Sequence, residues 1–114
     1  MKIHNNGPGW EQALHDLAAA HPRLPIILAH GGGFGMPRIM KGVPNVYFEF
    51  CAGGIHCEVT RNALHEPGPE RLLFGTDQDL FDAGFELGGY WDAALTPEQA
   101  ELIMYRNAKR LFGL

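Results

Sequence analysis

The chain has 114 residues, which is the length of one ordinary domain, and we expect residues 1–114 to form a single domain. A hydrophobic fraction of 46% and a charged fraction of 19% are typical of a globular protein and exclude intrinsic disorder. The net charge of -4 provides no attraction to nucleic acid or anionic lipid.

No apolar run approaches the roughly 20 residues that span a bilayer, and residues 1–6 contain no apolar core of a signal peptide. Cys51 and Cys57 are the only cysteines, too few for a disulfide scaffold. We therefore expect a cytoplasmic protein without a membrane or nucleic-acid partner.

Four segments are predicted to be strands. Residues 1–4 are a candidate short strand, and the continuous apolar run at 24–29 is typical of a strand buried on both faces. Residues 46–50 are β-branched and aromatic, and residues 71–76 form a third apolar run. Each of these three runs is followed closely by glycine or a polar residue.

Helices are predicted between and after these strands. Apolar residues recur at helical spacing over 9–21, and shorter helices are predicted in 36–43 and 55–66. The last helix begins with a capping box at residues 96–99 and stops at a glycine near the C-terminus. Residues 78–95 contain three glycines and the aromatic pair Tyr90-Trp91, and we predict a long, packed loop there.

Strands that alternate with helices predict an α/β fold with a parallel sheet. The chain has about four strand–helix units, whereas a closed (β/α)8 TIM barrel needs eight and about 250 residues. The predicted architecture is therefore about half of such a barrel. Open strand edges then predict completion by a second copy, as a homo-oligomer, or by a missing N-terminal half. A self-sufficient open sheet covered by helices is the alternative.

The ends of these predicted strands carry His4, His30, Cys51 and Asp77. In parallel α/β folds the chemistry collects at the carboxyl ends of the strands. Imidazole and carboxylate groups are good ligands for zinc and similar divalent ions. The recurrence of such groups at successive strand ends predicts a functional site.

Simpler interpretations exist for each residue. Asp77 could cap a following turn or helix, and His4 could be a solvated residue near the terminus. Glu49 is either a hydrogen-bond partner or substrate contact inside the barrel, or a partly exposed residue at a strand edge. A Cys/His zinc site around His56 and Cys57 is disfavoured because the spacing matches no paired-cysteine pattern.

Several blocks of the sequence resemble the amidohydrolase-related branch of the amidohydrolase superfamily, which includes aminocarboxymuconate-semialdehyde decarboxylase and resorcylate decarboxylases. Residues 21–33 (HPRLPIILAHGGG) resemble its sixth strand, and residues 45–50 (NVYFEF) its seventh. Residues 70–77 (ERLLFGTD) resemble the eighth strand, and residues 105–114 (YRNAKRLFGL) the closing helix. Ile3 and His4 are similar to the end of the fifth strand.

The resemblance implies a metal-dependent hydrolase that acts on a small molecule with metal-activated water. It implies His4 and Asp77 as metal ligands, His30 and Asp77 as catalytic residues, and zinc, or alternatively manganese, as the metal. Glu49 and Cys51 are further candidates for contacts to substrate or to the ligands.

The sequence also departs from the family pattern. The family carries a His-x-His pair on its first strand, and this chain contains none, so the chain by itself is expected to lack metal ligands. The alternatives are a metal-dependent decarboxylase of the same branch and a non-catalytic half-barrel that binds a ligand or associates with itself.

Overall fold

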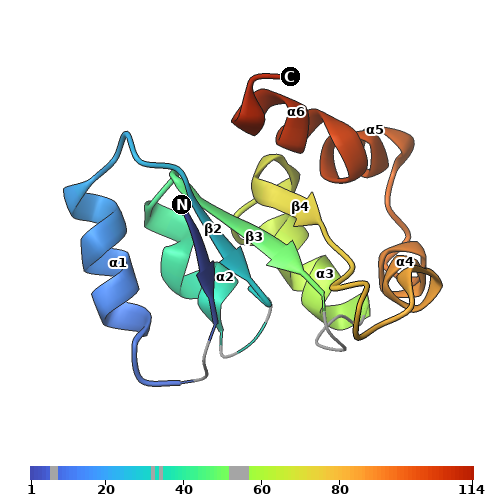
Figure 1. Cartoon of the computed structure of the whole chain (residues 1–114), viewed down its shortest axis with the longest axis horizontal. Coiled ribbons are helices and arrows are strands. Elements are labelled where there is room, and N and C mark those ends of the chain that lie inside the picture. Colours follow the sequence, from blue (N-terminus) through green and yellow to red (C-terminus); the bar gives the residue numbers. More distant parts are fainter. Residues whose placement is uncertain (6–7, 32, 34, 52–56) are drawn as a thin grey trace.

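A computed structural model describes residues 1–5, 8–31, 33, 35–51 and 57–114. Its centre is a four-stranded sheet in the order β1-β2-β3-β4, in which every neighbouring pair is parallel (Figure 1). The strands are β1 (Lys2–His4), β2 (Ile26–Ala29), β3 (Val46–Phe50) and β4 (Leu72–Phe74). The predicted α/β fold with parallel strand–helix units is confirmed.

Helical segments connect and follow the strands. The α-helices are α1 (Glu11–Ala20), α2 (Met36–Ile39), α3 (Cys57–His65), α4 (Ala83–Asp92), α5 (Pro97–Glu101) and α6 (Asn107–Phe112). Short 3-10 turns occupy Met40–Gly42 and Pro69–Arg71, and a π-helical turn, Leu102–Arg106, joins α5 to α6. The capping box predicted at Thr96 and Gln99 is present, and Gly113 ends α6 with a φ of 69°.

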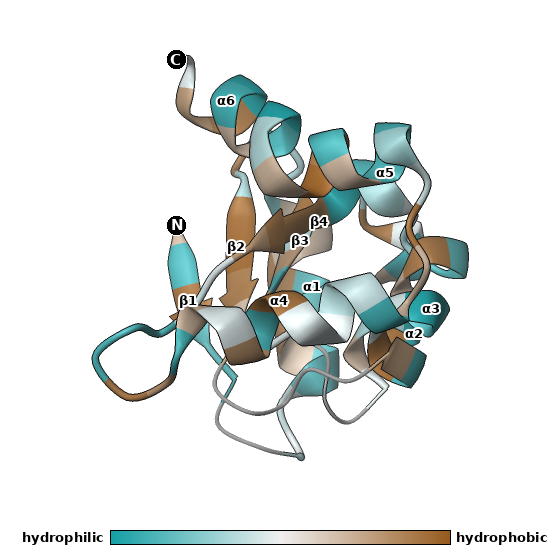
Figure 2. Cartoon of the chain, turned by 90° about the vertical axis from the view of Figure 1, so that its right-hand side faces the viewer, coloured by the Kyte–Doolittle hydropathy of each residue, from teal (hydrophilic) through white to brown (hydrophobic). Residues whose placement is uncertain are grey.

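The two faces of the sheet differ in chemistry. On the outer face, Ile3, Leu28, Phe48 and Leu72 stand side by side in the register of the four strands. The apolar core lies on this face, where strand residues pack with buried residues of α1, α2, α3 and α4. In Figure 2, β2 and β4 are coloured brown, the hydrophobic end of the scale, whereas much of β1 is teal. Burial of this apolar surface drives the sheet and helices together.

Alternate residues form the opposite, inner face of the sheet: Lys2, His4, Ile27, Glu49 and Leu73. This face is the one that carries charged and titratable side chains. It is therefore the face on which strand-end chemistry is expected. β1 and β4 form the two edges of the sheet.

The predicted loop at 78–95 is wrong, because α4 occupies Ala83–Asp92. The carboxylate of Asp82 caps this helix by accepting hydrogen bonds from the backbone N–H groups of Gly84 and Phe85. Tyr90 is fully buried, and its hydroxyl donates to the carbonyl of Leu73 at 3.3 Å. Burial raises the pKa of Tyr90, so the phenol stays a donor. The cap and this anchor outweigh the low helix propensity of the glycines.

The last predicted strand, at 71–76, is shorter than expected, because β4 spans only Leu72–Phe74. Arg71 belongs to a 3-10 turn before β4 and not to the strand itself. Its buried guanidinium donates hydrogen bonds to main-chain carbonyls. Burial lowers the pKa of Arg71 from its ordinary value. Its position fixes the start of β4 against the segment that precedes β3.

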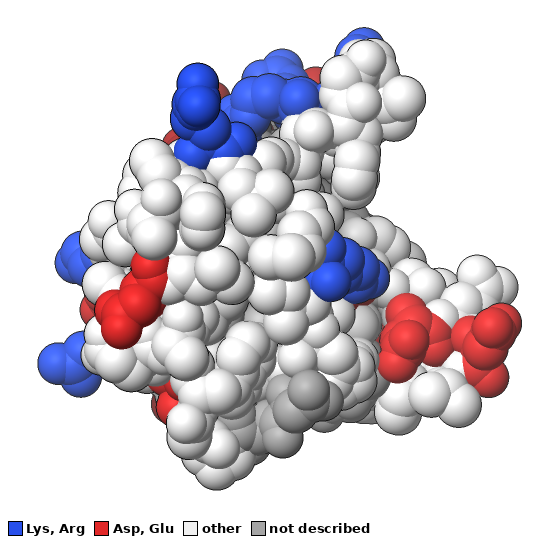
Figure 3. All heavy atoms as spheres, turned by 60° about the vertical axis from the view of Figure 1, so that its left-hand side comes forward, with Lys and Arg blue, Asp and Glu red and all other residues white. Residues whose placement is uncertain are grey.

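Figure 3 shows one face of the molecule, on which basic and acidic side chains stand in small separate groups between uncharged surface. On this face the described residues form no continuous basic patch. Among the described residues, no helix combines the length and the apolar character needed to cross a membrane.

Candidate active site

Polar side chains gather at the carboxyl edge of the sheet. His30 follows β2, Cys51 follows β3, and Asp77 lies three residues after β4. One ligand-capable atom of each of these residues lies within 4.8 Å of the others. Parallel topology therefore brings together three side chains from separate parts of the chain, all of which the sequence analysis named as candidate site residues.

His4 lies beside this cluster. The rings of His4 and His30 have centroids 4.5 Å apart and meet edge to face at 65°. His4 is exposed at the end of β1 and does not belong to the three-residue cluster. The structure thus places all four predicted strand-end residues at one edge, with His4 joined to the rest through His30.

His30 is held from several directions. Its backbone adopts a left-handed conformation with φ of 56°, which is uncommon for a residue with a side chain. Its Nδ1 lies 3.3 Å from the carbonyl oxygen of Cys51 and 3.2 Å from Cys51 Sγ. Because a carbonyl only accepts, Nδ1 carries the proton in that hydrogen bond and Nε2 keeps its lone pair. The ring therefore offers Nε2 for a ligand or a proton.

Gly31 is required immediately after His30 because the main chain there leaves no room for a side chain. A Cβ atom at position 31 would lie 2.8 Å from the carbonyl oxygen of Leu28 and 3.2 Å from Phe48. The main chain passes so close to β2 and β3 that only glycine fits. Gly32 and Phe34 of the same run lie outside the described residues.

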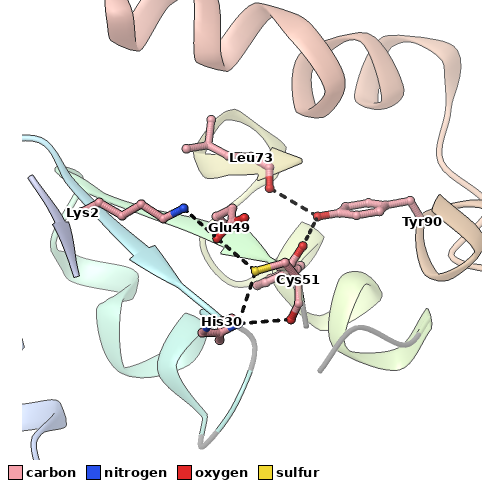
Figure 4. A network of polar contacts seen from close by, with 7 residues as sticks. Lys2, His30, Glu49, Cys51, Leu73 and Tyr90 are labelled. Carbon is pink, nitrogen blue, oxygen red and sulfur yellow. Dashed lines mark hydrogen bonds and ion pairs between the residues drawn. The ribbon is translucent and has the colours of Figure 1, made fainter. Parts of the chain in front are cut away.

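Glu49 is buried on the inner face, with 6% of its surface exposed, which excludes the partly exposed alternative in this structure. Its Oε2 accepts a hydrogen bond from Cys51 Sγ at 3.3 Å and lies 3.6 Å from Lys2 Nζ (Figure 4). A Cβ atom at position 75 would overlap the Glu49 carboxylate, so Gly75 leaves the space that this carboxylate fills. Glu49 thus links β1, β3 and the end of β4.

Cys51 is a thiol in this environment. Burial, followed by the charge of Glu49 and the hydrogen bond to it, raises the pKa of Cys51 to about 12. A reactive cysteine needs a thiolate, which this pKa disfavours at neutral pH. Cys51 therefore acts here as a hydrogen-bond donor to Glu49.

Asp77 is exposed and adopts a φ of 52°, a conformation that aspartate tolerates better than most residues. Its main-chain oxygen accepts hydrogen bonds from the N–H groups of Leu80 and Phe81 at 2.9 and 3.2 Å. The cap of α4 is Asp82. The carboxylate of Asp77 is therefore not the cap of this helix and lies instead with the strand-end cluster.

The predicted site residues did not include Lys2 and Asn5, which contact Glu49 and His30 respectively. Period-two alternation was the available signal for Lys2, since it stands two residues before His4 on the same face of β1. The disfavoured zinc site is not supported at Cys57, which lies outside the cluster. His56 lies outside the described residues. His15 lies on α1 and His65 on α3, and neither belongs to the cluster.

Parallel strand–helix units with polar residues gathered at their carboxyl ends define a part of a (β/α)8 barrel enzyme scaffold. The profile of the amidohydrolase family matches residues 12–114. A comparison with curated protein sequences gave no match.

Three solved structures illustrate the likeness in fold. 2,6-Dihydroxybenzoate decarboxylase from Rhizobium has a TM-score of 0.70 and 24% identity, and the match covers 94% of this chain and 43% of that chain. A zinc-bound amidohydrolase from Burkholderia multivorans has a TM-score of 0.72 and 16% identity, with coverages of 92% and 49%. A dihydroxybenzoic acid decarboxylase from a Polaromonas species, with bound manganese and 2-nitroresorcinol, has a TM-score of 0.72 and 22% identity, with coverages of 95% and 42%.

The chain belongs to the amidohydrolase family, which confirms the resemblance inferred from the sequence. It spans less than half of the length of each of these solved structures. Its four parallel strands and their helices are accordingly a partial TIM barrel, as predicted.

Proposed function

We propose that this chain provides part of the divalent-metal site of a metal-dependent hydrolase that acts on a small molecule. The observation that carries the proposal is the cluster of His30, Cys51 and Asp77, with His4 packed against His30, at the carboxyl edge of a parallel sheet. Metal-binding roles are proposed for His4 and Asp77, and catalytic roles for His30 and Asp77.

The donor groups fit a divalent ion in part. Two imidazoles and a carboxylate are ligand types that zinc and manganese accept, and the solved relatives include one structure with zinc and one with manganese. The chain contains no His-x-His pair, so further ligands have to come from a partner. We propose zinc as the metal, with manganese as the alternative.

A divalent ion bound there would lower the pKa of a water at the site toward neutrality and so make it a better nucleophile. In this proposal the Asp77 carboxylate would accept a proton from the water and later return it to the leaving group. His30, with Nδ1 held at the Cys51 carbonyl, would use the lone pair of Nε2 to accept a proton and so help to activate the water. The Cys51 thiol and Glu49 line the same inner face as candidate substrate contacts.

Decarboxylation is the second candidate, because two solved relatives from different bacteria are dihydroxybenzoic acid decarboxylases. In that reaction the bond to the carboxylate carbon breaks, carbon dioxide leaves, and a proton is delivered to the ring carbon. Asp77 and His30 are the groups of this chain that could deliver it. A non-catalytic half-barrel is the third candidate, and it predicts no metal binding at all.

A chimera distinguishes the two reactions. The part of the Rhizobium decarboxylase that this chain does not cover is joined to residues 1–114, which restores the full number of strands. Loaded with zinc or manganese, the chimera is expected to hydrolyse simple esters or amides if the first candidate holds. Release of carbon dioxide from 2,6-dihydroxybenzoate without hydrolysis would favour the second. An Asp77→Ala version of the chimera gives the background rate. A folded, metal-loaded chimera whose hydrolysis and decarboxylation rates do not exceed this background would contradict both candidate reactions.

The open edges of the sheet support a proposal about association. Within the described part of the chain, no strand pairs with the outer edge of β1 or of β4. Beside β4, a hollow of about 240 Å³ is lined by inner-face residues and by Phe112 of α6. We propose that a second copy or a complementary half-barrel covers these edges.

Light scattering after size-exclusion chromatography tests this association. The chain is expected to elute at about twice its mass of 12.6 kDa. Phe112→Lys should weaken the dimer, whereas Phe85→Lys on α4 should not, although both phenylalanines are 60% exposed. A monomer at every concentration would contradict association with a second copy.

A further inference from the structure

Asn5 joins the ends of β1 and β2 directly beside the candidate site. Its backbone N–H donates to the carbonyl oxygen of Ala29 at 3.0 Å, and its side-chain Nδ2 donates to the carbonyl oxygen of His30 at 3.2 Å. Asn5 therefore donates hydrogen bonds to two consecutive carbonyls at the end of β2. Asn5 is buried, with 8% of its surface exposed.

Trp10 orients the amide of Asn5. Its indole Nε1 donates to Asn5 Oδ1 at 3.2 Å, and because indole nitrogen only donates, this contact assigns the oxygen end of the amide. Trp10 is half-buried against the apolar core, and its carbonyl accepts from Leu14 at the start of α1. The indole is thus anchored by both packing and the helix.

The hydrogen bond from Asn5 reaches His30 at a point where the backbone adopts an uncommon conformation. His30 has a φ of 56°, a conformation that side-chain-bearing residues rarely adopt without compensating contacts. The hydrogen bond from Asn5 fixes the carbonyl of His30 itself. Since Asn5 also follows His4 directly, it sets the spacing between the two imidazoles, which is 4.5 Å between ring centroids.

We propose that Asn5, oriented by Trp10, is a positioning residue that holds His30 and His4 in the arrangement needed for ligand binding. The effect on metal affinity rests on the proposed function, whereas the effect on the imidazole rings does not. Asn5 acts only through His30 and His4. Loss of such support around metal ligands typically weakens binding about 10–100-fold.

Asn45 supplies a matched control. It is also a buried asparagine, and its Nδ2 donates to the carbonyls of Ala18, His21 and Leu24 at 3.1, 3.0 and 2.9 Å. These contacts lie at the amino end of β2, opposite the candidate site. Replacing either asparagine by leucine keeps the approximate volume and adds no charge.

The test compares Asn5→Leu and Asn45→Leu by zinc and manganese titration, by NMR of the histidine ring signals, and by thermal melting. Asn5→Leu is expected to weaken metal binding about 10–100-fold and to shift the ring signals of His30 and His4. Asn45→Leu is expected to lower the melting temperature while leaving metal affinity and these signals unchanged. Trp10→Phe, which removes only the N–H donor, should act in the same direction as Asn5→Leu and replaces it if that variant does not fold.

Unchanged affinity and unchanged ring signals in Asn5→Leu, or in Trp10→Phe where it is the variant used, would overturn the proposal. Equal losses of affinity in the Asn5 and Asn45 variants, in step with their melting temperatures, would also overturn it. If the unsubstituted chain binds no metal either alone or within the chimera, the proposed function fails. The ring signals then decide alone whether Asn5 positions the two imidazoles.

Discussion

Replacing Asp77 by alanine is expected to lower the affinity of the chain for zinc or manganese by more than about 100-fold, because outer contacts alone account for about 10–100-fold at metal sites. Asp77 supplies the only carboxylate of the three-residue cluster. The other proposed ligand groups, the imidazoles of His4 and His30, bind metal ions as neutral donors and cannot replace the charge of Asp77. His4→Ala is expected to weaken binding in the same direction.

Competition with a chromogenic chelator measures these affinities. Asp92→Ala is the control for Asp77, since Asp92 is an exposed aspartate at the end of α4. His21→Ala is the control for His4, because His21 is exposed at the end of α1. Bound metal that survives both Asp77→Ala and His4→Ala would reject the assigned ligands.

Arg71→Met is expected to lower the free energy of unfolding by roughly 3–5 kcal/mol, since each buried carbonyl that loses its donor costs about 1–3 kcal/mol. Arg71 is 9% exposed, and its guanidinium lies over the ring of Phe48 at 5.7 Å. It donates to the main-chain carbonyls of Pro67, Met40, Lys41, Val43 and Val46. Methionine retains the packing and removes every donor.

Urea denaturation measures this loss. The free energy of unfolding of Arg71→Lys should lie between those of the unsubstituted chain and Arg71→Met. One ammonium group cannot reach all the carbonyls that the guanidinium contacts. Arg38→Met on α2, where the arginine is exposed, should change the free energy of unfolding by less than about 0.5 kcal/mol. A loss below about 1 kcal/mol for Arg71→Met would show that water replaces these donors.

The strands and their parallel order could be predicted because their sequence signals are local. The runs around β2 and β3 are apolar, short, and bounded by prolines and glycines. Alternation with helices leaves few topologies other than a parallel sheet. The capping box at Thr96 is likewise a local pattern, which the structure reproduces.

Helix α4 could not be predicted from local propensity. Gly84, Gly88 and Gly89 each disfavour a helix by about 1 kcal/mol relative to alanine. The compensation comes from Tyr90, which inserts into the core and reaches carbonyls of β3 and β4. That contact joins residues far apart in the sequence.

The site was predictable as a set of strand ends but not as a geometry. The carboxyl ends of parallel strands meet, so His4, His30, Cys51 and Asp77 could be expected at one edge. The left-handed backbone of His30 and Asp77 has no sequence signal in residues other than glycine. The fit of the Glu49 carboxylate into the space left by a glycine depends on how close β3 and the end of β4 approach.

The central claim is that His4, His30 and Asp77 share one divalent-ion site. NMR of the histidine rings during addition of substoichiometric Mn²⁺ tests it most directly, because the paramagnetic ion broadens only nearby signals. We predict that the His4 and His30 signals broaden first in the unsubstituted chain and persist in Asp77→Ala. Broadening that begins at His15, His21 or His65, or that spares both His4 and His30, would contradict the claim.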